Sequence, residues 1–424
     1  MNDQRVLLKA MFEAAVEAVV PAACLPAFLP DPASIAGEIV VIGAGKAGAE
    51  MARIAGQHFG DRVRGLVVTR YGHTANGPVS PNIEVIEASH PVPDAAGQQA
   101  AARMIDMVEA LGPDDLIVCL LSGGGSALLS APAAGLTLED KQSVTAALLR
   151  SGATISQINC IRKHLSLVKG GRLAIAAAPT PMLTLAISDV PGDDPAVIAS
   201  GPTVPDPTTF ADAAALLKTF NITEPQSVLD HIAAARDETP TAEDPRLANA
   251  RFQMIATPAA ALTAAADLAR DAGYTPVLLG DDLEGESRDV AAAHAALALD
   301  HQSRGLRVAI LSGGETTVTI RDGIASTGRG GPNAEYALGL AVALEGAAGI
   351  SAIACDTDGV DGSEDNAGAI ITPDSHDRAV GAGMNAQEYL EANDSYGFFE
   401  NLDDLVISGP TRTNINDFRV ILVD

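Results

Sequence analysis

The stretch IVVIGAGKAGAEMARIAG, residues 39–56, sets the expected fold of this chain. An uninterrupted apolar run leads into the pattern G-x-G-x-x-G, formed by Gly43, Gly45 and Gly48, and a helical pattern follows. That order is typical of a strand, a tight glycine turn and a helix in a parallel α/β sheet. Three interpretations of the turn stay open: a dinucleotide site, close packing of strand and helix, or a phosphate-binding loop in which Lys46 supplies the charge.

The dinucleotide interpretation needs a second feature further along the chain. An Asp or Glu about 20 residues on, at the end of the next strand, holds the ribose hydroxyls in such folds. Here that strand is RGLVVTRYG, residues 64–72, and its end carries Thr69, Arg70 and Tyr71. The missing carboxylate weakens an NAD site, although Arg70 could meet the 2′-phosphate of NADP.

The rest of the chain continues the same alternation of short apolar runs and longer Ala-rich helical patterns. Apolar strands separated by helices predict a mostly parallel sheet covered on both faces. We therefore expect two α/β domains, a Rossmann-like one over residues 1–240 and a second over 241–424, joined through the polar segment 233–252. Strands are expected at 39–42, 66–69, 83–88, 116–121, 182–188, 275–280, 308–311 and 350–355, and helices at 95–111, 138–150, 156–177, 259–272, 288–302 and 334–344.

Composition narrows the classes of partner. The chain has 54 acidic and 27 basic residues and a formal charge of −27. Such a surface repels nucleic-acid phosphates and anionic membranes, so neither is an expected partner. The four cysteines form no C-x-x-C pair, and the N-terminal stretch is typical of an amphipathic helix rather than a signal peptide. These features favour a soluble, cytoplasmic protein.

Basic and glycine-rich segments suit anions. The loop Ser122–Ser126, SGGGS, permits positive φ and close approach of an anion, yet no Walker A pattern is present. A helix over 158–169, ending at Gly170 and Gly171, is expected to carry basic side chains on one face. In so acidic a chain this group is either a solvated helix face or an anion pocket; its members are Arg162, Lys163, Lys169 and Arg172.

Carboxylates follow strands in both halves. SDVPGDD, residues 188–194, supplies Asp189, and ACDTDGVDG, residues 354–362, supplies Asp356, Asp358 and Asp361. Aspartates with few other ligands suit Mg²⁺ bound together with substrate phosphates. Asx-rich turns without a metal are the alternative interpretation.

Further polar loops lie in the second half. Ser-Gly-Gly follows the strand 308–311, as it follows the strand 116–121. Arg329 lies between glycines just before a helix, and GPTRTNINDF, residues 409–418, is dense in hydrogen-bond donors. These loops are expected to bind a small charged ligand.

Eight of these motifs, in this order, resemble one known family, the glycerate 2-kinases whose C-terminal part is called the MOFRL domain. The resemblance spans nearly the whole chain, and members of the family have often been labelled hydroxypyruvate reductases, a name tied to tartrate degradation. The motifs are GAGKAGAEMA (43–52), LLSGGGSALL (120–129), INCIRKHLSLVKGGRLA (158–174), SDVPGDDPAVIASGPTVPD (188–206), LSGGETTV (311–318), GRGGPNAEYAL (328–338), DTDGVDG (356–362) and GPTRTNINDF (409–418).

The resemblance implies ATP-dependent phosphorylation of D-glycerate, most often to 2-phosphoglycerate, in a cleft between two α/β domains. It implies that Lys46 and Arg329 stabilise the transferring phosphate and that Asp189 is a base or metal ligand. It also implies that Asp356, Asp358 and Asp361 bind Mg²⁺ or position the nucleotide. Substrate and nucleotide contacts are expected at Gly43, Gly45, Ser122, Gly123, Gly124, Gly125, Ser126, Arg162, Lys163, Gly313, Gly314, Glu315, Asn333, Thr411 and Asn414.

Two questions stay open at this point. An NAD(P)H-dependent hydroxypyruvate reductase is the alternative activity, supported by the glycine turn and Arg70. A non-catalytic sensor of sugar acids or nucleotides is a third possibility. A homodimer is a possible assembly.

Overall fold

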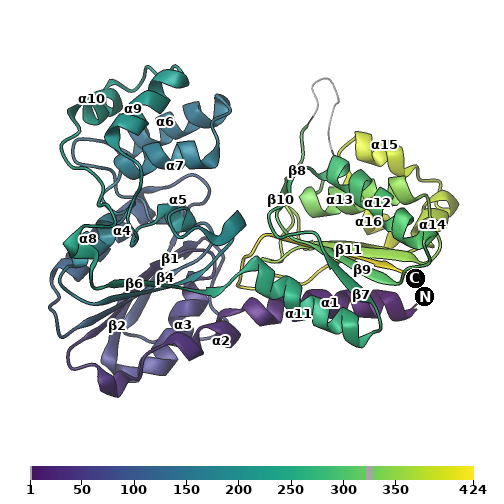
Figure 1. The fold of residues 1–424 in the computed structure, drawn as a ribbon, viewed down its shortest axis with the longest axis horizontal. Helices are drawn as coiled ribbons and strands as arrows, with labels where there is room; N and C mark the ends of the chain where they lie inside the picture. Colours follow the sequence, from purple (N-terminus) through teal and green to yellow (C-terminus); the bar gives the residue numbers. More distant parts are fainter. Residues whose placement is uncertain (1, 321–327) are drawn as a thin grey trace. The chain divides into compact units, whose positions relative to one another are not determined.

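The computed structural model describes residues 2–320 and 328–424. They form two compact units (Figure 1). The first is the continuous segment Pro21–Ile255, and the second joins Met1–Val20 to Ala256–Asp424.

The first unit is built on a six-stranded sheet with the strand order β3-β2-β1-β4-β5-β6. The pairs β1/β2, β1/β4, β2/β3 and β4/β5 are all parallel, as the sequence predicts. Its strands are β1 (Ile39–Ala44), β2 (Val63–Arg70), β3 (Ile83–Ala88), β4 (Leu116–Leu121), β5 (Met182–Ile187) and β6 (Ala250–Ala256).

Helices cover both faces of this sheet. Figure 1 shows α2 and α3 on one side and α4, α5 and α8 on the other. A separate group of α6, α7, α9 and α10 packs around its own apolar core. The helices are α2 (Pro21–Cys24), α3 (Gly48–Phe59), α4 (Ala95–Glu109), α5 (Gly125–Leu128), α6 (Leu138–Arg150), α7 (Ile155–His164), α8 (Arg172–Ala177), α9 (Phe210–Thr219) and α10 (Gln226–Ala234).

The helix predicted over 156–177 is two helices, α7 and α8, with an irregular segment between them. Ser166 interrupts the helix because its backbone bridges to Pro132 and its hydroxyl donates to the carbonyl of Ala131 at 3.2 Å. Gly170 and Gly171 then take φ of +58° and +81°. This break decides where the side chain of Lys169 lies.

The first unit ends later than the predicted boundary at residue 240. The polar segment 233–252 runs into β6, an edge strand in which side chains alternate. Ala250, Phe252 and Met254 pack against the core, whereas the residues between them are exposed. The alternation is too short and too interrupted by polar residues to show as an apolar run, which is why the sequence predicts a linker there.

The second unit contains a mixed six-stranded sheet with the order β13-β12-β11-β14-β9-β7. Only β7 and β9 pair in parallel; the other pairs are antiparallel. Its strands are β7 (Thr275–Leu278), β9 (Val308–Ser312), β11 (Ile350–Asp356), β12 (Gly368–Ile371), β13 (Leu405–Val406) and β14 (Asp417–Val423), and a small parallel pair is formed by β8 (Glu284–Glu286) and β10 (Glu315–Thr317).

Helices again cover both faces of the second sheet, with α1 and α11 on one side and α12 and α13 on the other (Figure 1). The N-terminal helix belongs here because its apolar face, including Leu8, Met11 and Phe12, is buried. The ring of Phe12 lies 5.9 Å from that of Phe418. The helices are α1 (Asn2–Val19), α11 (Pro258–Asp271), α12 (Ser287–Ser303), α13 (Pro332–Leu344), α14 (Ser375–Gly381), α15 (Ala386–Glu391) and α16 (Ser395–Leu402).

Within the described residues, no single helix has the length and apolar character needed to cross a membrane; one bent pair, 4–19 with 21–34, meets the test only when taken together. All four cysteines are buried free thiols.

Candidate active site

Three loops meet at the carboxyl ends of β1, β4 and β5, where ligands bind in open α/β sheets. Lys46 follows β1, Gly124 follows β4 and Asp189 follows β5. Gly124 has φ of +81°, and a β-carbon placed there would lie 3.5 Å from Cγ of Lys46 and 3.1 Å from the ring of His90. Burial raises the pKa of Asp189, and the charge of Lys46 opposes that rise. The structure therefore brings the predicted residues Lys46 and Asp189 into one electrostatic environment.

The glycine turn of the opening stretch uses its own backbone donors. The N–H groups of Gly45, Lys46, Ala47 and Gly48 donate to Val68 O, Gly123 O, Ser122 Oγ and Gly45 O, at 3.1, 2.8, 3.0 and 2.9 Å. These N–H groups are therefore engaged inside the protein, and what the turn offers a ligand is the side chain of Lys46.

The glycines of this turn are explained by packing. A β-carbon on Gly43 would lie 2.2 Å from the carbonyl oxygen of Leu120, and one on Gly45 would lie 2.0 Å from Ser122 Oγ. Gly45 also has φ of +148°. Close approach between neighbouring loops and strands therefore requires both residues, and their predicted part in binding stays a prediction.

The second loop, Gly123–Ser126, has two backbone N–H groups that are not used in hydrogen bonds within the described residues. The N–H groups of Gly123 and Gly124 donate to no acceptor in the portion of the chain that the structure covers, whereas Ser122 N donates to Ala44 O at 3.2 Å and Gly125 N to Ser122 O, also at 3.2 Å. Adjacent backbone donors beside a lysine are an arrangement that suits phosphate oxygens. The predicted anion cradle therefore fits this loop better than the first one.

The basic group on α7 and the segment after it divides into two kinds. Lys163 Nζ lies 3.2 Å from Asp206 Oδ1, and the guanidinium of Arg172 pairs with Asp237. Arg162 and Lys169 have no ion pair with any carboxylate in the described residues. Lys163, a predicted substrate contact, is thus already neutralised, and the uncompensated charge of this group lies on the other two.

Among the predicted metal ligands, Asp361 holds a helix terminus. Its Oδ1 accepts the N–H of Asn333 at 2.9 Å, and its Oδ2 accepts the N–H of Ala334 at 2.8 Å, both at the start of α13. Burial, reinforced by the charge of Asp417, raises the pKa of Asp361 to about 7. A carboxylate that gives both oxygens to backbone donors does not fit a metal ligand.

The other two aspartates of this loop form Asx turns. Asp356 Oδ1 accepts the N–H of Asp358 at 2.8 Å, and Asp358 Oδ1 accepts the N–H of Val360 at 2.9 Å. In residues 2–320 and 328–424, no three His, Cys, Asp or Glu side chains are grouped so as to hold a metal. The 409–418 loop lies against these turns, because Thr411 donates its N–H to Asp358 O at 3.0 Å.

Sequence reasoning missed two charged residues of the second unit, Asp417 and Arg419, both on the buried strand β14. Asn333 Nδ2 donates to Asp417 Oδ1 at 2.6 Å, and an Arg419 guanidinium nitrogen donates to Gly313 O at 2.9 Å. Together with Asp361 they gather Gly313 and Asn333, both predicted contacts, into one buried network. The signal was the D-x-R pattern in an otherwise apolar strand, since charges there require partners.

The remaining predicted residues lie elsewhere in the second unit. Arg329 pairs with Glu400 at 2.8 Å and stacks over the ring of Tyr396, with its side chain 48% exposed. Glu315 is exposed on β10, and Gly314, with φ of +100°, packs on the backbone of Leu283. Asn414 is buried in the 409–418 loop and accepts the N–H of Asn416 at 3.4 Å. Their functional roles stay predictions.

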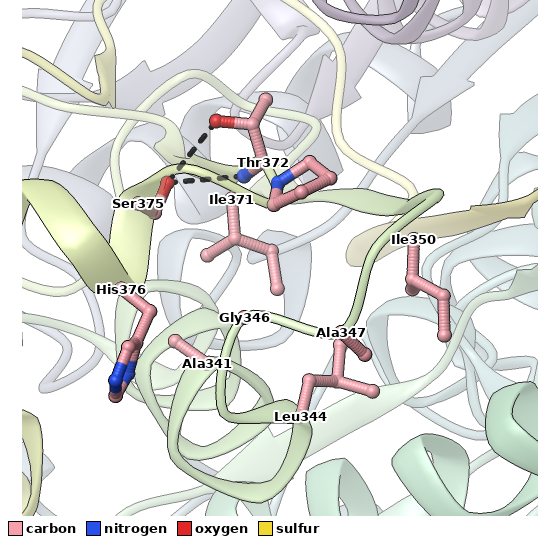
Figure 2. Close-up of a pocket in the computed structure, with 10 residues that line it drawn as sticks. Ala341, Leu344, Gly346, Ala347, Ile350, Ile371, Thr372, Ser375 and His376 are labelled. Carbon is pink, nitrogen blue, oxygen red and sulfur yellow. Dashed lines mark hydrogen bonds between the residues drawn. The ribbon is translucent and has the colours of Figure 1, made fainter.

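A small cavity in the second unit is unrelated to these residues. Figure 2 shows it between the end of α13, the beginning of β11 and α14, lined mostly by apolar side chains such as Leu344, Ile350 and Ile371. Its volume of about 10 Å³ holds no more than one water molecule. It adjoins Ile350 at the start of β11, whereas the aspartate loop follows the opposite end of that strand.

Comparison with known proteins identifies the class. Residues 7–233 match a domain of unknown function, DUF4147, and residues 308–417 match the MOFRL family. A chain from Agrobacterium vitis, provisionally named a hydroxypyruvate reductase, is 50% identical and covers 99% of this chain and 94% of its own. The D-glycerate 2-kinase of Thermotoga maritima is 38% identical over 91% of this chain and 90% of its own.

The fold agrees with a solved relative over its full length. The crystal structure of a glycerate kinase from Thermotoga maritima matches with a TM-score of 0.90 and 35% identity, covering 100% of both chains. Fold and matches together define a two-domain α/β protein of the glycerate kinase class. The chain belongs to the MOFRL family, which confirms the resemblance and the α/β architecture predicted from the sequence.

Proposed function

We propose that this protein is a glycerate 2-kinase, which transfers the γ-phosphoryl group of ATP to D-glycerate and forms 2-phosphoglycerate and ADP. The observation that carries the proposal is the meeting of Lys46, Asp189 and the open donors of Gly123 and Gly124 at the ends of parallel strands. The family membership supports the same reaction.

Each of these groups has work in phosphoryl transfer. The ammonium group of Lys46 and the N–H groups of Gly123 and Gly124 stabilise negative charge on phosphate oxygens. Asp189 accepts the proton of the substrate hydroxyl; its raised pKa makes it a stronger base than an exposed aspartate. Transfer breaks the bond between the β–γ bridging oxygen and the γ-phosphorus, and forms one from the hydroxyl oxygen to that phosphorus.

Mg²⁺ enters this proposal only with the nucleotide. An ion bound to ATP phosphates needs just one or two protein carboxylates. The predicted three-aspartate site does not fit, because Asp361 is committed to the start of α13. Arg162, Lys163 and Arg329 keep their predicted roles as substrate and phosphate contacts, and a cytoplasmic location and a homodimer likewise stay predictions.

Coupled detection of ADP with D-glycerate and Mg²⁺ tests the activity, and phosphorus NMR of the product separates 2- from 3-phosphoglycerate. A folded protein that releases no ADP would contradict the proposal. The reductase alternative predicts instead a loss of NADH or NADPH absorbance with hydroxypyruvate. No structural observation favours it, since the N–H groups of the glycine turn are engaged and β2 ends in Arg70 rather than a carboxylate.

A further inference from the structure

Three basic side chains of the first unit come from α6, from α7, which packs against α6, and from the segment that follows α7. They are Lys141 of α6, Arg162 of α7 and Lys169, which follows α7. Burial, and after it the charge of Arg162, lowers the pKa of Lys141. Burial, and after it the charges of Lys141 and Arg162, lowers the pKa of Lys169, so the three groups lie within range of mutual repulsion. We call them the cationic cluster.

Lys141 occupies a position that a core residue would normally fill. It lies on the buried face of α6 with Leu138, Val144 and Leu148 and is only 6% exposed. Its Nζ has no hydrogen-bond partner among the described residues. Burying an ammonium group without a partner is costly, and its pKa is accordingly lowered to about 7; a bound anion would stabilise the charged form, which no group of the described residues does through a hydrogen bond to Nζ.

Lys169 connects the cluster to the candidate active site. It is 2% exposed, and its Nζ donates to Ser126 O at 2.6 Å and lies 3.0 Å from Ser126 Oγ. Ser126 Oγ lies 2.7 Å from Ser200 Oγ. Ser200 Oγ in turn donates to Asn159 Oδ1 at 3.2 Å, so the two hydroxyl groups form a hydrogen-bonded chain, and Ser126 is the polar residue in contact with Lys169.

Two neighbouring basic residues differ from the cationic cluster in their pairing. Lys163 and Arg172 come from the same stretch of chain, and each is paired with an aspartate. In these two residues an aspartate therefore compensates for the burial of the positive charge. Among the residues that the structure describes, no member of the cationic cluster forms an ion pair, although the chain has twice as many acidic as basic residues.

We propose that Lys141, Arg162 and Lys169 form a binding site for a small oxyanion, a phosphate or carboxylate group. Such a group supplies the negative charge that the cluster lacks and accepts the unused N–H bonds of Lys141. The inference deepens the proposed kinase function and rests on it, since Arg162 is also a predicted substrate contact, but the binding that it predicts can be measured without turnover.

Direct binding without nucleotide tests this site. Isothermal titration calorimetry with inorganic phosphate and, separately, with D-glycerate at pH 7 distinguishes the two sources of the anion. We compare the wild type with Lys141→Met, which keeps the length of the side chain and removes its charge. Lys218→Met, on the exposed side of α9, is the matched control. Arg162→Gln provides a second variant if Lys141→Met does not fold.

We expect at least one of the two anions to bind the wild type, with a Kd raised tenfold or more in Lys141→Met or Arg162→Gln and unchanged in Lys218→Met. Lys141→Met should raise, not lower, the melting temperature of the anion-free protein. Replacing a lysine with a merely structural role would not have this effect. Failure of both anions to bind at millimolar concentration would overturn the proposal. So would a Kd that Lys46→Met weakens and Lys141→Met leaves unchanged. Kinase activity is measured separately with the coupled ADP assay, so that failure of the anion site and failure of the kinase proposal can be told apart.

Discussion

The backbone N–H of Lys46 donates to the carbonyl oxygen of Gly123 at 2.8 Å, and this bond fastens the two glycine loops to one another. The N–H groups of the first loop are thus used in bonds within the protein, whereas the N–H groups of Gly123 and Gly124 in the second loop make no hydrogen bond within the described residues. Because the bond uses the backbone of Lys46, the side chain can be changed without breaking the contact.

Replacing Lys46 by Met should therefore separate activity from stability. We expect turnover of D-glycerate to fall by about a hundredfold or more, since a charge that stabilises transferring phosphate is lost. The melting temperature should stay within about 2 °C of the wild type, because the loop bond is retained. The coupled ADP assay and thermal unfolding measure the two effects. A variant with wild-type turnover would remove Lys46 from the mechanism.

Asp189→Asn should abolish the base without moving the backbone. We expect a large loss of kcat and the disappearance of the acid limb of the pH profile of kcat, which the carboxyl group of Asp189 produces as it is protonated. Because its pKa is raised, this limb should lie above the ordinary range of an aspartate. A profile whose acid limb survives the substitution would assign it to another group.

Gly45→Ala should destabilise the first unit strongly. A β-carbon there meets Ser122 Oγ at 2.0 Å, and φ is +148°. We expect a loss of about 2–4 kcal/mol in the free energy of unfolding, measured in urea. Gly72→Ala is the control, since Gly72 has φ of +79° but no atom within 4 Å of its β-carbon position. A cost of about 1 kcal/mol there separates backbone strain from collision.

Asp361 should make stability depend on pH in a defined window. Its pKa is raised from 3.8 to about 7 on folding, so the folded state binds more protons between these values. The stabilising contribution is present below pH 4 and is lost as pH rises to 7, by up to about 1.4 kcal/mol per pH unit. Urea unfolding of wild type and Asp361→Asn from pH 4.5 to 7.5 should show this slope only in the wild type. Equal slopes would contradict the assignment.

Lys141 should produce the opposite dependence at higher pH. Burial lowers its pKa from 10.5 to about 7, so the unfolded chain binds more protons in this interval and stability rises with pH. Arg162 and Lys169 are the charged groups that act on it. Helix α10 also packs against α6, and its His231 forms a hydrogen bond through Nε2 with the carbonyl oxygen of His164. We expect Lys141→Met to exceed the wild type in unfolding free energy at pH 7 and the difference to shrink by pH 9. A constant difference would contradict the lowered pKa.

Local sequence patterns predicted the first unit well. The strand, turn and helix around Gly43 and Lys46 follow from an apolar run and glycine spacing, and the parallel order of β1 to β5 follows from the alternation of elements. The break between α7 and α8 was missed because it depends on Ser166 meeting Ala131, a contact between residues 35 positions apart.

The candidate site was harder to predict for the same reason. Asp361 has the spacing of a metal ligand, yet its partners Asn333 and Ala334 lie 28 and 27 residues earlier in the chain. Lys141 carried a signal that was not used: a lysine in the apolar register of an amphipathic helix. The spacing of charged residues in the sequence identifies candidate site residues. Their burial and their partners in the fold decide which of them stabilise the structure instead.

The packing of α1 on the second unit has a consequence for how the chain is made. Residues 21–255 form a continuous unit that can fold as soon as it has been synthesised. Phe12 of α1, in contrast, finds its ring partner Phe418 only when almost the whole chain has left the ribosome. The apolar face of α1 therefore stays without its native partner until β14 has been synthesised, and it is open to aggregation during that time.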